Sequence, residues 1–537
     1  MERLLLKKYQ DDVLISQEDE LGEVMIFGTG TMGSGLYEEI VKRVEVVAYI
    51  DNDPEKQGGT CQGKKIFSVK EAQAYMRTKK DMYIMVASFF FEEEIIAQLV
   101  SLGLEERIVI PVIPDIVEND LRSEYTASFL EQIERSKKRY LDRETKDARM
   151  KMMFVVNLGA TFSSFESIYQ IMSEDECFEV VLVVSPIRKD ASHVSMSYEY
   201  VYDQNILTYF EEKGYPYVFA YEKGNWIDIW ANQPDVIFYN TVYQEKQLPK
   251  ILRIQTYAKE IKIVYTEQGT FAGEVFANPE MINRITDSFL KKCWRVFLGK
   301  EGYEHYQSRE EYGEKGNLVF SGSPKVDFYR LPVVAEKEYF RGKESVKILY
   351  TPAPFNFPGR STFLEYHKYL KDLVLERQEI ELIIRPHPFM VTEMIQQKLI
   401  GESQLEEIIG FFETHERTMW DRGGDYRKIF LEADFAIMDR STINYEFLLS
   451  GKPMLYNYRR RVSDLGINDK IIEASYVIES VDELEETIAK LLIGRDDKKD
   501  KREQVVGAYM QEMFPHGSSN AAYICEYIKQ NLRKGIL

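Results

Sequence analysis

Two residues suited to phosphate chemistry stand together in the turn Arg385-Pro386-His387-Pro388. Arginine offers a fixed fork of donors that fits phosphate oxygens, and histidine can donate a hydrogen bond or move a proton near neutral pH. The turn follows the apolar stretch 380–384, and its two prolines cannot continue a strand ladder. Because ligands of open α/β sheets bind at the carboxyl ends of strands, we expect an anion site here. The alternative is a strand-ending turn whose arginine only caps a helix.

A second group of polar residues follows another apolar strand, predicted over 433–439. This strand ends at Asp439, and Ser441 is predicted to cap the next helix, with Thr442 beside it. Free backbone N–H groups and two hydroxyls at a helix start form a cradle for a diphosphate. Glu446, further along the same helix, offers an acceptor for ribose hydroxyls. A serine cap alone needs no ligand, so the interpretation depends on the whole set and on the arginine-histidine turn.

The glycines Gly28, Gly30 and Gly33 follow a short apolar strand and precede a helical stretch, and Asp51 ends the next strand. This is the Rossmann fingerprint in its βαβ setting, where glycines let a phosphate approach and the acid binds a ribose. The segment 49–66 resembles small Rossmann-like domains appended to bacterial sugar-modifying enzymes and transferases. No catalytic tyrosine-lysine pair or substrate domain follows. We therefore expect docking or assembly here, rather than binding of an NAD-like nucleotide.

Apolar strands alternate with helical patterns in three successive series, too long for one core. We predict a small Rossmann-like domain (1–115), a charged helical connector (116–150) and two larger halves (151–340 and 341–537). Two Rossmann-like halves that face across a cleft form the architecture called GT-B. The predicted fold class is therefore α/β, a GT-B-like pair of Rossmann-type domains preceded by a small Rossmann-like domain. Besides the two strands above, strands are predicted at 24–27, 44–50, 152–157, 178–184, 217–220, 235–239, 262–265, 318–320, 346–352 and 452–456.

Composition limits the classes of function. The chain has a formal net charge of −19, which argues against nucleic-acid binding because that needs a basic face. No run approaches the roughly 20 apolar residues of a membrane span, and residues 1–8 are too soon charged for a secretory signal. Cys61, Cys177, Cys293 and Cys525 are scattered without metal-ligand or disulfide spacing, so we expect a reducing cytoplasm and no metal. Peripheral attachment to the inner face of the membrane and oligomerisation stay open.

Five segments in order along residues 150–530 resemble the CDP-glycerol glycerophosphotransferase family of teichoic-acid polymerases and primases. The Arg-Pro-His-Pro turn and the stretch 433–453 carry most of the resemblance. Residues 322–327 are similar to the family's Gly-x-Pro-Arg-x-Asp, and 348–352 to its Leu-Tyr-x-Pro-Thr strand. Residues 514–519 resemble its Phe-x-Asp-Gly-x-x-Ser signature.

The resemblance implies transfer of a polyol phosphate, such as glycerol phosphate, from a CDP-activated donor to an acceptor hydroxyl, with release of CMP. The acceptor would be a polyol phosphate or a glycan of a cell-surface polymer, free or lipid-linked, and no cofactor is required. Positioning and charge stabilisation would carry most of such a reaction, together with a base for the acceptor's proton. The residues placed on the donor are Gly269, Thr270, Arg385, His387, Asp439, Ser441, Thr442 and Glu446.

One departure from the family concerns the general base. The family's Trp-His-Gly-Thr appears here as Glu267-Gln268-Gly269-Thr270, so glutamine, which cannot act as a base, stands where the proposed basic histidine belongs. Glu267 is the candidate replacement, although neighbours on an extended segment point in opposite directions. Glu267 and His387 are therefore the catalytic candidates. Another acid could serve instead, the donor could be a nucleotide sugar used for glycosyl transfer, or the protein could be a non-catalytic nucleotide-binding scaffold.

Overall fold

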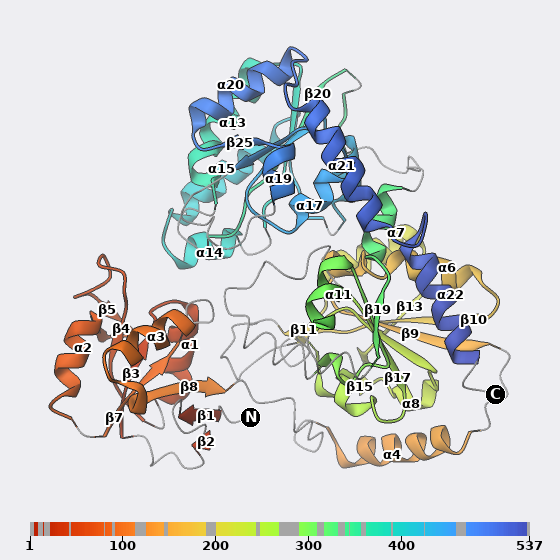
Figure 1. Ribbon diagram of the computed structural model, residues 1–537, viewed down its shortest axis with the longest axis horizontal. Coiled ribbons are helices and arrows are strands. Elements are labelled where there is room, and N and C mark those ends of the chain that lie inside the picture. The colour runs from red at the N-terminus through yellow and green to blue at the C-terminus, as the bar shows by residue number, and fades with distance from the viewer. Residues whose placement is uncertain are drawn as a thin grey trace.

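The chain forms three α/β units, each built on its own sheet (Figure 1). The computed structural model describes residues 5–8, 14–15, 22–41, 44–79, 81–87, 92–112, 125–143, 149–188, 200–242, 248–267, 289–308, 316–330, 339–342, 344–355, 361–387, 390–423, 425–457 and 469–533.

The first unit is an eight-stranded sheet with the order β2-β1-β8-β7-β3-β4-β6-β5. Its central strands are parallel, whereas β1, β2 and β5 pair antiparallel at the two ends. Its elements are β1 (Leu5–Lys8), β2 (Leu14–Ile15), β3 (Glu23–Phe27), α1 (Thr31–Ile40), β4 (Glu45–Ile50), β5 (Thr60–Cys61), β6 (Lys64–Phe67), α2 (Val69–Met76), β7 (Met82–Val86), α3 (Glu92–Ser101), η2 (Glu105–Arg107) and β8 (Ile108–Val112).

The second unit is a seven-stranded, all-parallel sheet with the order β13-β10-β9-β16-β17-β18-β19. Helix α4 (Ala127–Leu141) precedes it and packs on its α8 side. The other elements are β9 (Met150–Val156), α5 (Gly159–Phe162), α6 (Glu166–Glu174), β10 (Phe178–Val184), β11 (Ile187–Arg188), β12 (Tyr200–Val201), α7 (Gln204–Lys213), β13 (Tyr217–Phe219), β14 (Tyr221–Glu222), β15 (Asn225–Trp226), α8 (Ile229–Asn232), β16 (Val236–Tyr239), η4 (Lys250–Leu252), η5 (Ile254–Thr256), β17 (Lys262–Thr266), β18 (Arg295–Leu298), α11 (Lys300–Gln307) and β19 (Leu318–Phe320).

The third unit is a six-stranded parallel sheet with the order β22-β21-β20-β23-β24-β25. A short helix, η6 (Pro324–Tyr329), leads toward it. Its elements are β20 (Val346–Thr351), α13 (Phe363–Glu376), β21 (Ile380–Ile384), α14 (Met390–Gln396), α15 (Glu402–Thr414), β22 (Thr418–Trp420), α16 (Arg427–Glu432), β23 (Phe435–Met438), α17 (Ile443–Leu448), β24 (Met454–Asn457), α19 (Asp469–Ala474), β25 (Tyr476–Ile478), α20 (Val481–Leu492), α21 (Lys499–Met513) and α22 (Asn520–Arg533).

The second and third sheets share one topology. In each, the first three strands in chain order run toward one edge and the later strands toward the other. This is the doubly wound order 3-2-1-4-5-6, with a seventh strand, β19, at the edge of the second sheet. In such sheets ligands bind beyond the carboxyl ends of the two strands where the direction of winding reverses. In the third sheet these two strands are β20 and β23.

The last helix returns to the second unit (Figure 1). Helix α21 buries Val505, Tyr509 and Met513 in the core of the third unit. Helix α22, after it, packs beside α6 and buries Ile524 and Ile528 in the core of the second unit. Two doubly wound parallel sheets joined by such a return define the GT-B architecture, so the fold class predicted from the sequence is confirmed.

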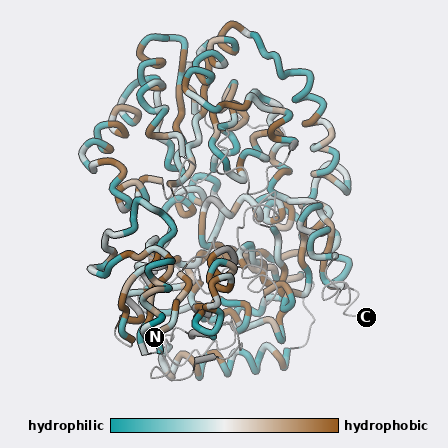
Figure 2. The backbone as a smooth tube through the Cα atoms, turned by 60° about the vertical axis from the view of Figure 1, so that its left-hand side comes forward, coloured by the Kyte–Doolittle hydropathy of each residue, from teal (hydrophilic) through white to brown (hydrophobic). Residues whose placement is uncertain are grey.

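Each sheet is covered by apolar side chains on both faces, and two hydrophobic clusters accompany each sheet. Figure 2 shows the hydrophobic stretches in the interior of the units and hydrophilic turns outside. The apolar strands predicted from the sequence correspond to β3, β4, β9, β10, β13, β16, β17, β19, β20, β21, β23 and β24. The predicted charged helix of the connector is α4. The domain limits at 115, 150 and 340 stay predictions.

Candidate functional site

The two predicted donor-binding segments meet at the carboxyl edge of the third sheet. Strands β21 and β23 flank β20 on either side. Beyond the strand ends, the Arg385 N–H donates to the Tyr350 carbonyl (2.8 Å) and the Asp439 N–H donates to that of Thr351 (3.2 Å). The His387 N–H donates to the carbonyl of Pro352 (3.0 Å). These bonds anchor both segments to the end of β20, at the switch point of the sheet.

Arg385 is held by two neighbours. Its guanidinium donates to the carboxylate of Asp421, which follows β22, and it lies 5.0 Å above the ring of Tyr426. Only 13% of the Arg385 side chain is exposed, so it has few alternative positions. A cation fixed in this way is preorganised for an anion. His387 is partly buried beside it, and Pro388 lies outside the described residues.

The carboxylate of Asp439 is used to hold the fold together. Its buried carboxylate accepts hydrogen bonds from the backbone N–H groups of Ala353 and Thr362 (2.9 Å each), from the Thr362 hydroxyl (2.6 Å) and from the Asn457 amide (2.7 Å). Burial raises the pKa of Asp439, and these bonds lower it only in part. Four donors already satisfy this carboxylate, so Asp439 ties the loop after β20 to the end of β23.

The prediction that Ser441 caps the following helix is wrong. Helix α17 begins at Ile443, so Thr442 precedes it, and the Thr442 side chain makes no capping bond. The Ser441 carbonyl instead accepts from the Asn444 N–H (3.2 Å), which tightens the first turn. Helix α17 has six residues, and so short a helix contributes little dipole. Ser441 and Thr442 keep their hydroxyls at the switch point, partly exposed.

Glu446 joins the two halves of the molecule instead of standing alone. Its Oε1 accepts from the Tyr426 hydroxyl (2.7 Å) and pairs with Lys325 Nζ (2.7 Å), and both charged side chains are buried. Lys325 comes from η6, in the segment that crosses toward the third unit, and its Nζ lies 5.3 Å from the Tyr426 ring. Glu446 Oε2 has no hydrogen-bond partner among the residues that the structure describes. One carboxylate oxygen therefore holds the crossing segment while the other stays unsatisfied.

Glu267 follows β17 at the carboxyl edge of the second sheet. Its Oε2 accepts from the Gly299 N–H (2.9 Å), at the start of α11, whereas Oε1 has no partner within the described part of the chain. Burial raises the pKa of Glu267 to about 7, and the Gly299 bond lowers it only in part. A carboxyl with this pKa can take or give a proton near neutral pH. Gln268, Gly269 and Thr270 lie outside the described residues.

Two glycines of the motif in the first unit lie against the backbone of the protein itself. Gly28 has a φ of +114°, and a Cβ there would lie 2.6 Å from the Ala87 carbonyl oxygen. A Cβ on Gly33 would lie 1.9 Å from the Gly28 carbonyl oxygen, whereas Gly30 faces open space. Close backbone packing therefore accounts for Gly28 and Gly33 without a ligand.

The carboxylate of Asp51, the predicted ribose-binding acid, accepts hydrogen bonds from residues of the neighbouring loops. Its Oδ2 accepts from both the hydroxyl and the N–H of Thr29, and Oδ1 accepts from the Asp53 N–H (3.0 Å). Burial raises the pKa of Asp51, but these bonds and Lys56 outweigh it, so the pKa is lowered. The loop thus uses acceptors of Asp51 that a ribose would need, and the docking or assembly role of this unit stays a prediction.

Two further motif segments build the joint between the units. The carboxylate of Asp327 accepts from the N–H groups of Asn520 and Ala521 (2.9 Å each) and from the Ser519 hydroxyl (2.7 Å), which caps α22. His516 lies against β19, with Nε2 2.6 Å from the Phe320 carbonyl oxygen. The segments 322–327 and 514–519 therefore meet in space and fix the return of the chain.

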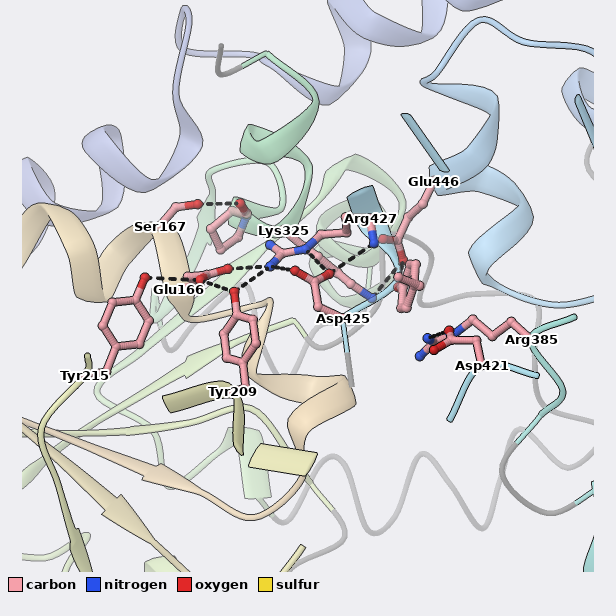
Figure 3. Close-up of polar contacts among 12 residues, drawn as sticks. Glu166, Ser167, Tyr209, Tyr215, Lys325, Arg385, Asp421, Asp425, Arg427 and Glu446 are labelled. Atoms are coloured by element: carbon pink, nitrogen blue, oxygen red, sulfur yellow. Dashed lines mark hydrogen bonds and ion pairs between the residues drawn. The ribbon is translucent and has the colours of Figure 1, made fainter. Parts of the chain in front are cut away.

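Sequence reasoning missed a buried charged cluster between the halves. Arg427 pairs with Asp425 (2.9 Å) and, across the interface, with Glu166 of α6 (Figure 3). Asp421, the partner of Arg385, and Tyr426, the partner of Glu446, were also missed. The signal in the sequence is the tripeptide 425–427 just before the predicted strand at 433–439, but its partners are too distant in sequence to be inferred.

The described residues hold no group of three or more His, Cys, Asp or Glu side chains placed to bind a metal ion. Among the described helices, none combines the length and the apolar character needed to cross a membrane.

The fold and this edge define a GT-B-like protein with an additional Rossmann-like unit. A family model described as C2185-like, N-terminal, matches residues 21–110, within the first unit. No curated protein matches the chain. The structure is similar to a Listeria monocytogenes protein assigned as a UDP-N-acetylglucosamine 2-epimerase, with 15% identity, a TM-score of 0.48 and coverage of 72% of this chain and 98% of that one.

Two other solved structures are similar to the same degree. One is a variant of the wall teichoic acid polymerase TagF, with 13% identity, a TM-score of 0.47 and coverage of 76% of this chain and 96% of that one. The other is S. aureus MnaA with UDP, with 15% identity, a TM-score of 0.45 and coverage of 72% and 97%. At these values we draw no functional conclusion from the three neighbours.

Proposed function

We propose that the protein transfers a polyol phosphate from a CDP-activated donor to an acceptor hydroxyl during synthesis of a cell-surface polymer. The observation that carries the proposal is the meeting of the Arg385-His387 turn and the Ser441-Thr442 segment on either side of β20. A donor diphosphate at this switch point would lie between a fixed guanidinium and two hydroxyls. The family resemblance of the same segments supports the choice of donor.

The chemistry needs a cation for the leaving group and a base for the nucleophile. The acceptor oxygen forms a bond to the phosphorus of the polyol phosphate, the bond from that phosphorus to the bridging oxygen breaks, and CMP leaves. We assign the charge on the departing phosphate to Arg385, with His387 as a donor beside it. We assign the acceptor's proton to Glu267, because its buried carboxyl has a pKa of about 7 and an oxygen to which no described residue donates.

Nucleotide binding is the first test. Differential scanning fluorimetry of the full chain with CDP, CMP, UDP, GDP and NAD would reveal the donor class. A ligand at 100 times its dissociation constant stabilises the fold by roughly 2.7 kcal/mol, which is a visible melting shift. We expect a response to the cytidine nucleotides alone. A response to UDP or GDP would favour a nucleotide-sugar glycosyltransferase, and no response at all would favour a scaffold.

The site itself is tested with a matched pair of arginines. Arg385→Gln should abolish the cytidine shift and the release of CMP from CDP-glycerol. Arg377→Gln is the control, because Arg377 precedes β21 at the opposite edge of the sheet and its side chain is 58% exposed. If the two variants bind and turn over alike, Arg385 is not part of the donor site.

A further inference from the structure

A buried charged cluster ties the second unit to the third. Arg427, the first residue of α16, donates to Asp425 through Nε and Nη2 (2.9 Å each) and to Glu166 through Nη2. From the side of the second unit, the hydroxyls of Tyr209 and Tyr215 donate to Glu166 Oε1. We call these five residues the Arg427 cluster; Figure 3 shows Arg427 at its centre.

The two residues at the centre of the cluster are buried, and the other three are partly buried. Only 2% of the Arg427 side chain and 6% of the Glu166 side chain are exposed. The guanidinium also lies 4.6 Å above the ring of Phe328 in η6. It therefore touches the second unit, the crossing segment and the third unit at once. The pKa of Asp425 is lowered: burial raises it, and the pairing with Arg427 outweighs that effect.

Such a cluster selects one arrangement of the halves. A guanidinium and a carboxylate as buried as Arg427 and Glu166 are tolerated only while each charge keeps its partners. A small rotation between the units would strip Glu166 of the guanidinium while it stayed buried, whereas full opening would return both to water. We therefore expect orientations between these two to be disfavoured, because each would leave a buried charge without its partner.

The same tripeptide also holds the donor-side residues. Tyr426 lies between Asp425 and Arg427 in the chain. The Tyr426 hydroxyl donates to Glu446 Oε1. The guanidinium of Arg385 lies over the Tyr426 ring, 5.0 Å from its centroid. In Figure 3 the Arg385 pair lies on the side of Glu446, away from Glu166. The turn 425–427 thus connects the interface cluster to the donor clamp by direct contacts.

We propose that Arg427 is a positioning residue that locks the donor half against the acceptor half in the orientation used for transfer. Glu166 is its counterpart on the acceptor half. Neither residue is assigned a contact with the donor, the acceptor or a reacting atom. The kinetic part of the proposal rests on the proposed function, and the geometric part does not.

The geometric test measures the distance between the halves without substrate. Spin labels at Lys259→Cys in the second unit and Glu376→Cys in the third, both exposed positions, report that distance by pulsed electron resonance. The partly buried Cys61 and Cys177 are replaced by serine in this background. We expect one narrow distance distribution for the otherwise native chain.

Glu166→Gln is the decisive variant, because the amide keeps the shape of the side chain and loses only its charge. We expect a second, longer distance population. The control is Glu174→Gln, an exposed glutamate at the end of the same helix, which should leave the distribution narrow. Tyr209→Phe keeps the ring and removes one donor to Glu166, so it should broaden the distribution less. A narrow distribution in both Glu166→Gln and Tyr209→Phe would overturn the proposal.

Kinetics separate positioning from simple stabilisation. A misplaced half lowers turnover by about tenfold or more while donor binding stays intact, since small displacements of reacting groups are costly. We therefore expect Glu166→Gln to lower kcat with the donor KM within about twofold. Arg427→Lys keeps the charge without the fork and should recover only part of the activity. A lower melting temperature with unchanged kcat and unchanged distances would reduce the cluster to a stabilising contact. If no nucleotide is turned over, the distance measurement still decides the geometric claim.

Discussion

Replacing Glu267 by glutamine measures the free energy needed to ionise one buried carboxyl. Burial raises its pKa from the ordinary 4.5 to about 7, and the bond from the Gly299 N–H offsets this only in part. A displacement of about 2.5 pKa units at 1.36 kcal/mol per unit corresponds to about 3 kcal/mol. Because only 4% of Glu267 is exposed, solvent screens little of this free energy.

The direction in which the free energy of unfolding changes with pH depends on whether the folded or the unfolded chain holds the proton of Glu267. In the unfolded chain the carboxyl ionises near pH 4.5, whereas in the fold it keeps its proton to about pH 7. Between these values the folded state binds more protons, so the free energy of unfolding falls as the pH rises. The stabilising contribution is complete below pH 4.5 and is lost once the pH passes about 7.

Urea unfolding of the native chain and of Glu267→Gln at pH 5 and pH 8 measures this directly. The amide has nearly the shape of the protonated carboxyl, so the two proteins should be of similar stability at pH 5. At pH 8 the variant should be more stable than the native chain by about 3 kcal/mol. Glu174→Gln, at an exposed position, is the control for the substitution itself. A difference between Glu267→Gln and the native chain that is the same at both pH values would refute the raised pKa.

The kinetic consequence is separate. If Glu267 is the base, kcat/KM of the native chain rises through about pH 7 and levels off above it. Glu267→Gln should lose that limb and about 100-fold or more in kcat, the usual contribution of a positioned base. Unchanged turnover would remove Glu267 as the base while leaving the stability result intact.

Three further substitutions test single contacts. Gly33→Ala should unfold the first unit, because its Cβ would lie 1.9 Å from a backbone carbonyl oxygen. Gly30→Ala is the control, since its Cβ would enter open space. Melting curves followed by circular dichroism would compare the two variants. Asp327→Ala removes the acceptor for three donors at the start of α22 and should cost about 1–3 kcal/mol, seen as faster hydrogen exchange in that helix. Lys325→Met leaves Glu446 buried without its cation and should cost about 3–5 kcal/mol in urea unfolding. Adding Glu446→Gln to Lys325→Met should recover most of that loss, and a double variant no more stable than the single one would contradict the pairing.

The fold could be predicted because the sequence patterns that specify its strands and helices lie within short segments of the chain. Runs of apolar residues bounded by turns identify the central strands, and the order in which they alternate with helices indicates doubly wound sheets. Strands that are short or less apolar, such as β18, β22 and β25, were not predicted. The helix cap at Ser441 was misplaced because a one-residue shift in the start of α17 changes which side chain faces the first turn.

The interface could not be predicted, because its contacts join residues far apart in the chain. Arg427 and Glu166 are 261 residues apart, and Lys325 of the crossing segment pairs with the distant Glu446. Which charges meet depends on how two separately folded units dock, and no periodicity in either segment encodes that. The sequence therefore located both halves of the candidate site but not the side chains that hold them together.

The buried carboxyls of the motifs differ in how fully the protein satisfies them, and this difference separates scaffolding from chemistry. Asp439 accepts from four donors and Asp327 from three. Glu446 accepts from two donors on one oxygen, and Glu267 from one. A carboxyl surrounded by donors cannot take a further proton or hydroxyl without losing a bond that holds the fold. Among the described contacts, Glu267 is the least satisfied of the four, and burial raises its pKa to about 7. If Glu267 is the base, the proton of the acceptor goes to a buried carboxyl that the fold leaves with one free oxygen among the described residues.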